Sequence, residues 1–116
     1  MFAPEFKEVK IFIRPGITDM RKSINGLSAL VQEEMQLDPY DKLLFMFCNK
    51  QRHLMKVLYW DRTGFCLWYK RLEKNKFPWL KKGDAKLQIT EAQLRLLLNG
   101  INFFEAHEEL KFSRVG

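Results

Sequence analysis

Three apolar runs of strand length follow one another in the middle of the chain, and they limit the possible folds more than any other feature. They are Leu43–Cys48, Leu54–Trp60 and Phe65–Leu72, separated by polar stretches of five and four residues. Apolar runs this short, bounded by turn residues, are typical of strands. Because connections this short join antiparallel neighbours, the segment predicts an antiparallel meander.

The second turn, Asp61-Arg62-Thr63-Gly64, has Asp first and Gly fourth, which are the residues preferred in a type I turn. We expect Asp61 and Gly64 to shape this turn and to do no chemistry. If position 64 adopts a positive φ, a glycine is favoured there and a β-branched residue fits poorly. Gly64→Val should then lower the thermal stability.

Before the meander, Val9, Ile11 and Ile13 alternate with Lys10, Phe12 and Arg14 and predict a half-buried strand that ends at Pro15-Gly16. Thr18 is expected to cap a helix that ends at Leu37-Asp38-Pro39. Gly26 inside this helix would allow another element to approach closely. The apolar face of the helix follows spacings of four, three, four and four, at Met20, Ile24, Leu27, Val31 and Met35.

After the meander, residues 73–82 form a basic loop and Lys86–Ile89 a short strand. Thr90 and Gln93 form a capping box for a second helix, which Asn99-Gly100 ends. Its apolar face is Leu94, Leu97, Leu98 and Ile101. The sequence therefore predicts one α+β domain over residues 1–116, with an antiparallel meander sheet of about four to five strands and two helices.

Positive charge is concentrated in one window of the chain. The 116 residues carry 20 Lys and Arg against 14 Asp and Glu, a net charge of +6. Residues 50–86 hold eleven of the cations and three acids, a local charge of +8, and the remainder sums to −2. Solubility alone would explain an excess, but its clustering favours an anionic partner, most often nucleic acid.

Between Tyr59 and Trp79, seven aromatic residues are interleaved with five Lys or Arg. Cations contact phosphates and exposed rings stack on unpaired bases, although rings on one strand face are also core-forming. We assign Trp60, Phe65 and Trp68 to the core. Lys70 and Arg71 are strand neighbours and point to opposite faces, so the main contact is expected from Arg71, Lys74 and Lys76.

At the predicted helix start, Arg21 and Lys22 could help to hold a phosphate, the alternative being a capped helix with a solvated polar face. The candidate nucleic-acid-binding residues are therefore Arg21, Lys22, Arg62, Lys70, Arg71, Lys74 and Lys76.

No motif for catalysis or metal binding stands out. Cys48 and Cys66 form no CxxC pair and are predicted to be reduced and structural. The other candidates for chemistry, Asp19, Asp61, Glu73, His53 and His107, fit no familiar constellation. We therefore expect no catalytic residues, no metal and no cofactor. The first ten residues show no signal peptide or membrane span, which predicts a cytoplasmic protein without a membrane partner.

Three stretches, TDMRKSINGL, YWDRTGFCLWYKRLEKNKF and a Thr-capped LLLNGIN, resemble the TnpB accessory proteins of IS66-type insertion sequences. The resemblance runs from about Val9 to Ile101. Tyr59 stands where the family often has a second Trp, and Pro78-Trp79 where it often has Trp-Pro. The matching positions are Asp19, Met20, Arg21, Lys22, Gly26, Leu27, Trp60, Asp61, Gly64, Phe65, Tyr69, Lys70, Arg71, Leu72, Glu73, Phe77 and Trp79.

Such proteins are encoded beside a separate transposase that holds the catalytic acids, so the resemblance implies an accessory role in transposition and brings no catalytic residues. The residues suggest a DNA-binding factor. The alternative is a protein-interaction module that docks on the transposase without touching DNA, with the aromatic side chains as hot spots. A nuclease comes third and would depend on Asp61.

Overall fold

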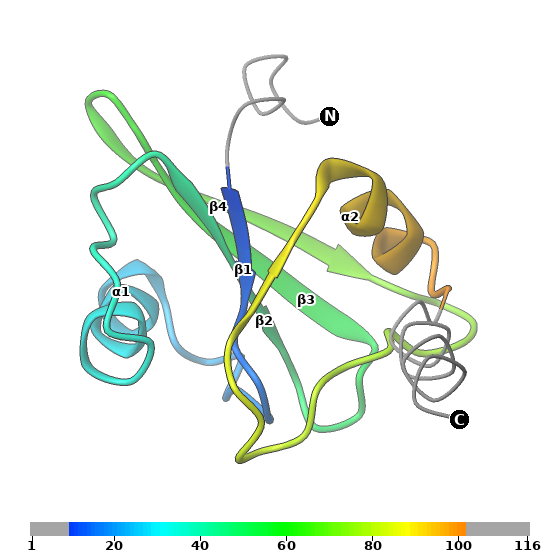
Figure 1. The fold of residues 1–116 in the computed structure, drawn as a ribbon. Helices are drawn as coiled ribbons and strands as arrows, with labels where there is room; N and C mark the ends of the chain where they lie inside the picture. The colour runs from blue at the N-terminus through cyan, green and yellow to red at the C-terminus, as the bar shows by residue number, and fades with distance from the viewer. Residues whose placement is uncertain (1–9, 102–116) are drawn as a thin grey trace, which may run out of the picture.

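A five-stranded sheet forms the centre of the protein, with one helix on each face (Figure 1). This is seen in a computed structural model that describes residues 10–101, so Val9, His107 and the residues after Ile101 lie outside it. The elements are β1 (Lys10–Ile13), α1 (Ile24–Glu33), β2 (Leu43–Cys48), β3 (Leu54–Asp61), β4 (Gly64–Arg71), β5 (Leu87–Ile89) and α2 (Glu91–Leu98).

The sheet order is β4-β3-β2-β1-β5. The predicted meander of β2, β3 and β4 is confirmed, and β5 pairs antiparallel with β1. The pairing of β1 with β2 is parallel, because α1 returns the chain to the end of the sheet at which β1 started. The α+β class is thus confirmed, with one parallel pair in a sheet that is otherwise antiparallel.

Each face of the sheet buries its own hydrophobic core. On one face, Leu27 and Val31 of α1 pack against Phe45, Phe47 and Leu58. On the other, Leu94, Leu97 and Leu98 of α2 pack over Leu44, Met46, Met55 and Val57. Because successive strand residues point to opposite faces, the uninterrupted apolar run of β2 is what a strand covered on both sides requires.

The first helix starts later than the sequence predicts. Thr18 does not cap it: its backbone N–H donates to the Cys48 carbonyl oxygen, and its hydroxyl accepts from Arg14 Nη1 at 2.8 Å. Asp19 instead folds the chain into a turn, since its carboxylate accepts the N–H of Arg21. Ser23 is the N-cap residue, without a side-chain capping bond.

The helix also ends earlier than expected, at Glu33, and Gln36 beyond it has a left-handed backbone with φ of 55°. At Gly26, a Cβ would lie 3.2 Å from the Lys22 side chain. We expected a different helix or strand to lie close to Gly26. The close neighbour is instead the Lys22 side chain, from the turn before the helix.

The hairpin between β3 and β4 is not a type I turn. Asp61 pairs with Gly64 in the ladder, and the loop consists of Arg62 and Thr63. Arg62 has a positive φ of 44°, whereas a type I turn needs a negative φ there. Gly64 has no positive φ, and a Cβ on it would meet nothing within 4 Å. The prediction that position 64 requires a glycine because of a positive φ is therefore wrong.

The second helix follows the sequence closely. The Thr90 hydroxyl accepts from the Gln93 backbone N–H, and the Gln93 side chain accepts from the Thr90 N–H, which completes the capping box. Gly100 takes the positive φ expected after the helix. Ile101 lies beyond the helix and is half exposed, so it is not part of the buried face.

Candidate nucleic-acid interface

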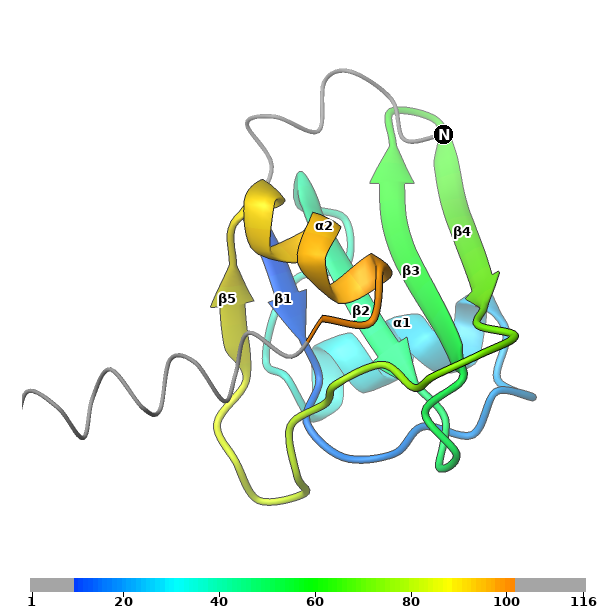
Figure 2. The same cartoon turned by 90° about the vertical axis from the view of Figure 1, so that its right-hand side faces the viewer.

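Most of the basic window gathers at one end of the sheet. There, the ends of β1, β2 and β4 meet the starts of β3 and β5, together with the loops 14–23, 49–53 and 72–86 (Figure 2). Apart from Arg62, every cation of residues 50–86 lies in these loops or within three residues of them. Cations that are clustered along the sequence are therefore also clustered at one end of the folded protein.

Tyr69 on the edge strand β4 is half exposed, and two cationic segments meet beside it. Its register partner Lys56 places its Nζ 5.9 Å from the centre of the ring, a cation–π distance. The same Nζ donates to the carbonyl oxygens of Met20 at 2.7 Å and Lys22 at 3.0 Å. The turn that carries Arg21 and Lys22 is therefore tied to β3 next to Tyr69.

Arg71 lies two residues after Tyr69, on the same face of β4. It forms an ion pair with Glu73 at 2.8 Å, but both side chains are exposed, so the pair contributes little stability and leaves Arg71 free to exchange partners. Lys74 and Lys76 follow in the exposed loop.

This loop is held at both of its ends. The Leu72 N–H donates to the His53 carbonyl at 2.8 Å, and the Phe77 N–H donates to the Arg52 carbonyl at 2.7 Å. Phe77 itself is fully buried in the core under α2. Lys74 and Lys76 are thus presented by an anchored loop. We call Arg21, Lys22, Lys56, Tyr69, Arg71, Lys74 and Lys76 the basic-aromatic patch.

Asp19 partly offsets the charge of the patch. The Arg21 side chain donates to both carboxylate oxygens at 2.7–3.1 Å, and these hydrogen bonds lower the pKa of Asp19 to about 2. Asp19 is therefore ionised at neutral pH. With Glu73 it reduces the six cations of the patch to an excess of four positive charges.

Two of the predicted binding residues lie elsewhere. Lys70 points to the opposite face of β4, where its Nζ donates to the Leu98 carbonyl at 3.0 Å and satisfies the C-terminal end of α2. Arg62 lies at the hairpin tip with Asp61 3.9 Å away. Seven strand residues separate the tip from Arg71, about 23 Å along β4. The structure thus brings Arg21, Lys22, Arg71, Lys74 and Lys76 to one end of the sheet. Lys70 lies at the same end but on the opposite face, and Arg62 lies at the other end.

The aromatic residues divide between the core and the surface. Phe65 and Trp68 pack, partly buried, against opposite cores. Trp79 serves the fold, since its Nε1 donates to the Arg14 carbonyl at 2.8 Å. Trp60 lies at the far end of the hairpin in a ring cluster with Phe65 and the exposed Tyr40, with centroids 5.0–5.1 Å apart.

Lys56, and the cations Lys50, Arg52, Lys81 and Lys82 at the same end, carry no sequence signal that distinguishes them from the other cations of the window. The charge window contained all five, but only the strand register and the packing of the loops show which way each one points. The one exception is the polar residue at position 56 of an otherwise apolar strand.

The residues that the sequence offered as candidates for chemistry do not come together in the structure. Asp61 is exposed at the hairpin tip, and the His53 ring lies 3.2 Å from the Asn49 amide. Both cysteines are free, and burial raises the pKa of Cys48 to about 12. Within residues 10–101, no group of three or more His, Cys, Asp or Glu could hold a metal ion. In the same range, no helix has the length and apolar character needed to cross a membrane.

Fold and site together define a small α+β domain with one cationic end. The chain belongs to the family of IS66 Orf2-like proteins, whose family model matches residues 9–108. It is 36% identical over 113 residues to "Uncharacterized protein y4hO" of Sinorhizobium fredii (strain NBRC 101917 / NGR234), covering 97% of this chain and 98% of the relative. "Uncharacterized protein y4jC" of the same strain is 32% identical over 95 residues, 82% of this chain and 81% of that protein. No solved structure matches.

Family membership confirms the resemblance found in the sequence. The protein is a transposition-associated accessory protein of an insertion sequence.

Proposed function

We propose that this accessory protein binds DNA through the basic-aromatic patch and does not itself catalyse a transposition step. The observation that carries the proposal is the position of Lys56 on β3, which ties the Arg21–Lys22 turn to the sheet next to Tyr69 of the edge strand. Cations from two distant parts of the sequence therefore lie at one end of the sheet, and a phosphate backbone that crosses this end would contact both groups.

Each part of the patch has a physical task in this proposal. The exposed cations neutralise phosphates and release condensed counterions, which is the main source of sequence-independent affinity. The half-exposed ring of Tyr69 offers a surface for a sugar or an unpaired base. Catalysis is left to the transposase, which the resemblance places beside this protein.

The test is the salt dependence of binding to a fluorescent DNA duplex, measured by anisotropy. With four to six phosphate contacts, the slope of log affinity against log salt should be about −3.5 to −5.5. A slope near zero, or no binding at about 100 mM salt, would contradict DNA binding.

A second candidate function has its own observation. Tyr40, Trp60 and Phe65 form an aromatic cluster at the end of the sheet opposite the patch, and the Tyr40 backbone is held by the Asp38 carboxylate at 2.9 Å. Exposed aromatic residues are frequent hot spots of protein interfaces, so this cluster would dock on the transposase without DNA contact.

A pull-down with the transposase of the element distinguishes the two candidates. If docking is the function, Tyr40→Ala combined with Trp60→Ala should abolish capture, and Lys74→Ala combined with Lys76→Ala should not. If DNA bridges the two proteins, nuclease treatment and the lysine variant should remove capture and the aromatic variant should not.

A further inference from the structure

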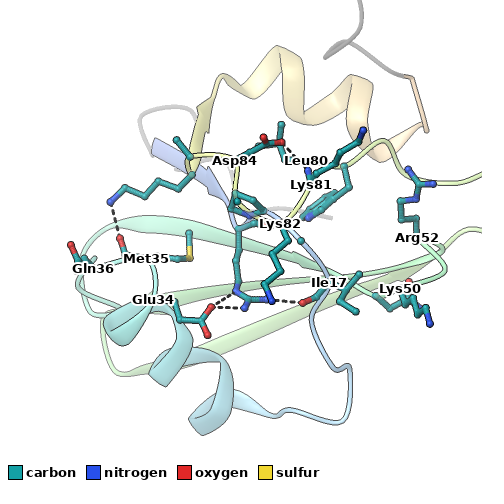
Figure 3. A pocket seen from close by; sticks show the side chains of 18 residues that line it. Ile17, Glu34, Met35, Gln36, Lys50, Arg52, Leu80, Lys81, Lys82 and Asp84 are labelled. Carbon is teal, nitrogen blue, oxygen red and sulfur yellow. Dashed lines mark hydrogen bonds and ion pairs between the residues drawn. The ribbon is translucent and has the colours of Figure 1, made fainter.

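A cavity of about 1080 Å³ opens at the same end of the sheet as the patch, between the loops that follow β1 and β2 and the loop that precedes β5 (Figure 3). No residue of the basic-aromatic patch lines it. Its volume slightly exceeds the range of about 300–1,000 Å³ that is usual for pockets that hold small ligands.

Hydrogen bonds hold two of the cavity walls together without a ligand. The Gly16 N–H donates to the Leu80 carbonyl at 2.9 Å, and Trp79 Nε1 donates to the Arg14 carbonyl at 2.8 Å. Gly16 has φ of +81°, and a Cβ there would lie 3.3 Å from the backbone of Lys82. Only glycine suits both this backbone conformation and this close approach. Gly16 therefore allows the loop after β1 to pack directly against the loop before β5.

The third wall is the turn between β2 and β3, which a buried side chain shapes. Asn49 Oδ1 accepts the backbone N–H groups of His53 and Leu54, each at 3.1 Å. Arg52 in this turn has φ of +60°, a region that a non-glycine residue occupies only under strain. Such strain is characteristic of functional sites, and here it fixes an arginine at the wall of the cavity.

The cavity carries more positive charge than its own acids can neutralise. Six cations and two acids line it. Arg14 is engaged by Glu34, and Lys86 Nζ donates to the Met35 carbonyl at 2.7 Å. Asp84 accepts the backbone N–H of Lys81. Within residues 10–101, four of the six lining cations make no side-chain hydrogen bond or ion pair, namely Lys50, Arg52, Lys81 and Lys82.

Apolar groups line the cavity between these cations. They include Pro15, Leu80 and Ile17, and the Ile17 side chain is 59% exposed. A DNA duplex presents mainly phosphates to a protein surface and keeps its base faces stacked inside. An apolar wall between cations therefore suits a strand whose bases are unpaired.

We propose that this cavity binds an unpaired segment of a nucleic-acid strand, with its phosphates on Lys50, Arg52, Lys81 and Lys82 and a base against Ile17 and Leu80. This inference rests on the proposed function for its class of ligand, and it adds a site separate from the patch. Duplex DNA would lie on the patch while an unpaired strand enters the cavity.

The test compares two fluorescent probes on the full chain: an oligothymidine of about 12 nucleotides, within the usual site size, and a duplex of equal length. The cavity variant is Arg52→Asn with Lys82→Ala, in which Asn tolerates the left-handed backbone. The control variant, Lys10→Ala with Lys42→Ala, removes the same charge at the opposite end of the sheet. A second cavity variant, Lys50→Ala with Lys81→Ala, replaces the first if that one fails to fold.

Because the cavity variant removes two cations that bind phosphate, the oligothymidine slope should flatten by about 1.4 and its affinity should fall about 10- to 25-fold near 100 mM salt. Duplex binding should change no more than in the control variant. An abasic oligonucleotide of equal charge should bind the parent several-fold more weakly, and Ile17→Ser should remove that difference.

The cavity proposal would be overturned if the parent did not bind oligothymidine, if the cavity and control variants lost equal affinity, or if the abasic strand bound equally well. Displacement of the probe by polyglutamate as readily as by unlabelled oligothymidine would also refute it, because the site would then accept any polyanion. Absence of duplex binding, with cavity-dependent oligothymidine binding retained, would reject the patch as the duplex site and leave the cavity standing.

Discussion

The variant that tests the patch most directly replaces Arg71, Lys74 and Lys76 with alanine. All three side chains are exposed, and the loop that carries two of them is anchored by backbone hydrogen bonds and by the buried Phe77. The fold should therefore survive with its melting temperature nearly unchanged, since exposed substitutions of this kind usually change stability by less than about 0.5 kcal/mol.

The size of the binding effect follows from how many phosphates the three side chains neutralise. Each neutralised phosphate contributes about 0.9 to the slope of log affinity against log salt on duplex DNA, so three contribute about 2.7. Between about 50 and about 200 mM salt, the parent should then lose about 40-fold more affinity than the variant. If Glu73 already neutralises much of Arg71, the change in slope falls toward about 2.

The assay is fluorescence anisotropy of a labelled duplex over a salt series, with folding checked by circular dichroism. A control variant with Lys10, Lys42 and Arg95 changed to alanine removes the same charge from outside the patch and the cavity. It should keep the slope of the parent. If the folded patch variant keeps the parental slope, or if the control flattens it equally, the patch is not the DNA contact.

Four further outcomes are expected. Arg62→Asn should leave the salt slope unchanged, because Arg62 lies about 23 Å from Arg71 along β4; a loss near 0.9 would place the hairpin tip on the DNA. Gly64→Val should not lower the melting temperature, because Gly64 has no positive φ and open space around it; a clear drop would contradict the hairpin geometry. Thr90→Ala should lower the free energy of unfolding by about 1 kcal/mol in urea titrations, because it removes the helix cap, and no change would argue against the capping box. Cys48 should resist alkylation until the protein unfolds. Labelling of the folded protein at pH 8 would contradict this burial. Burial raises the pKa of Cys48 to about 12, so its contribution to the free energy of unfolding is complete below the unfolded thiol pKa of about 8.5 and decreases as the pH rises toward 12.

Local sequence determined the elements whose signals are local. The apolar runs of β2, β3 and β4, and the reciprocal cap of α2 by Thr90 and Gln93, appear in the structure where the sequence predicts them. Alternation along β4 also predicted that Lys70 and Arg71 face opposite sides. These features depend on residues close in sequence and on fixed backbone periodicities, so they can be read without knowing the rest of the fold.

Tertiary contacts decided the start of α1 and the geometry of the hairpin. Thr18 has the residue type of a helix cap, but its hydroxyl is engaged by Arg14 and its N–H by the Cys48 carbonyl. The Asp61–Gly64 segment has the residue preferences of a type I turn, but the strand register makes Arg62 adopt a positive φ. In both places a weak local preference is outweighed by hydrogen bonds to strands that the local sequence does not specify.

The candidate site divides in the same way. Charge and composition alone predicted an anionic partner and most residues of the patch. Cations that are close together in sequence stay close together in space in whatever way that segment folds. The sequence could not tell that Arg62 lies apart, that Lys70 satisfies the end of α2, or that Lys56 joins the Arg21–Lys22 turn to Tyr69. Those assignments depend on which residues, 28 to 36 positions apart in sequence, the sheet and the loops bring within hydrogen-bonding distance.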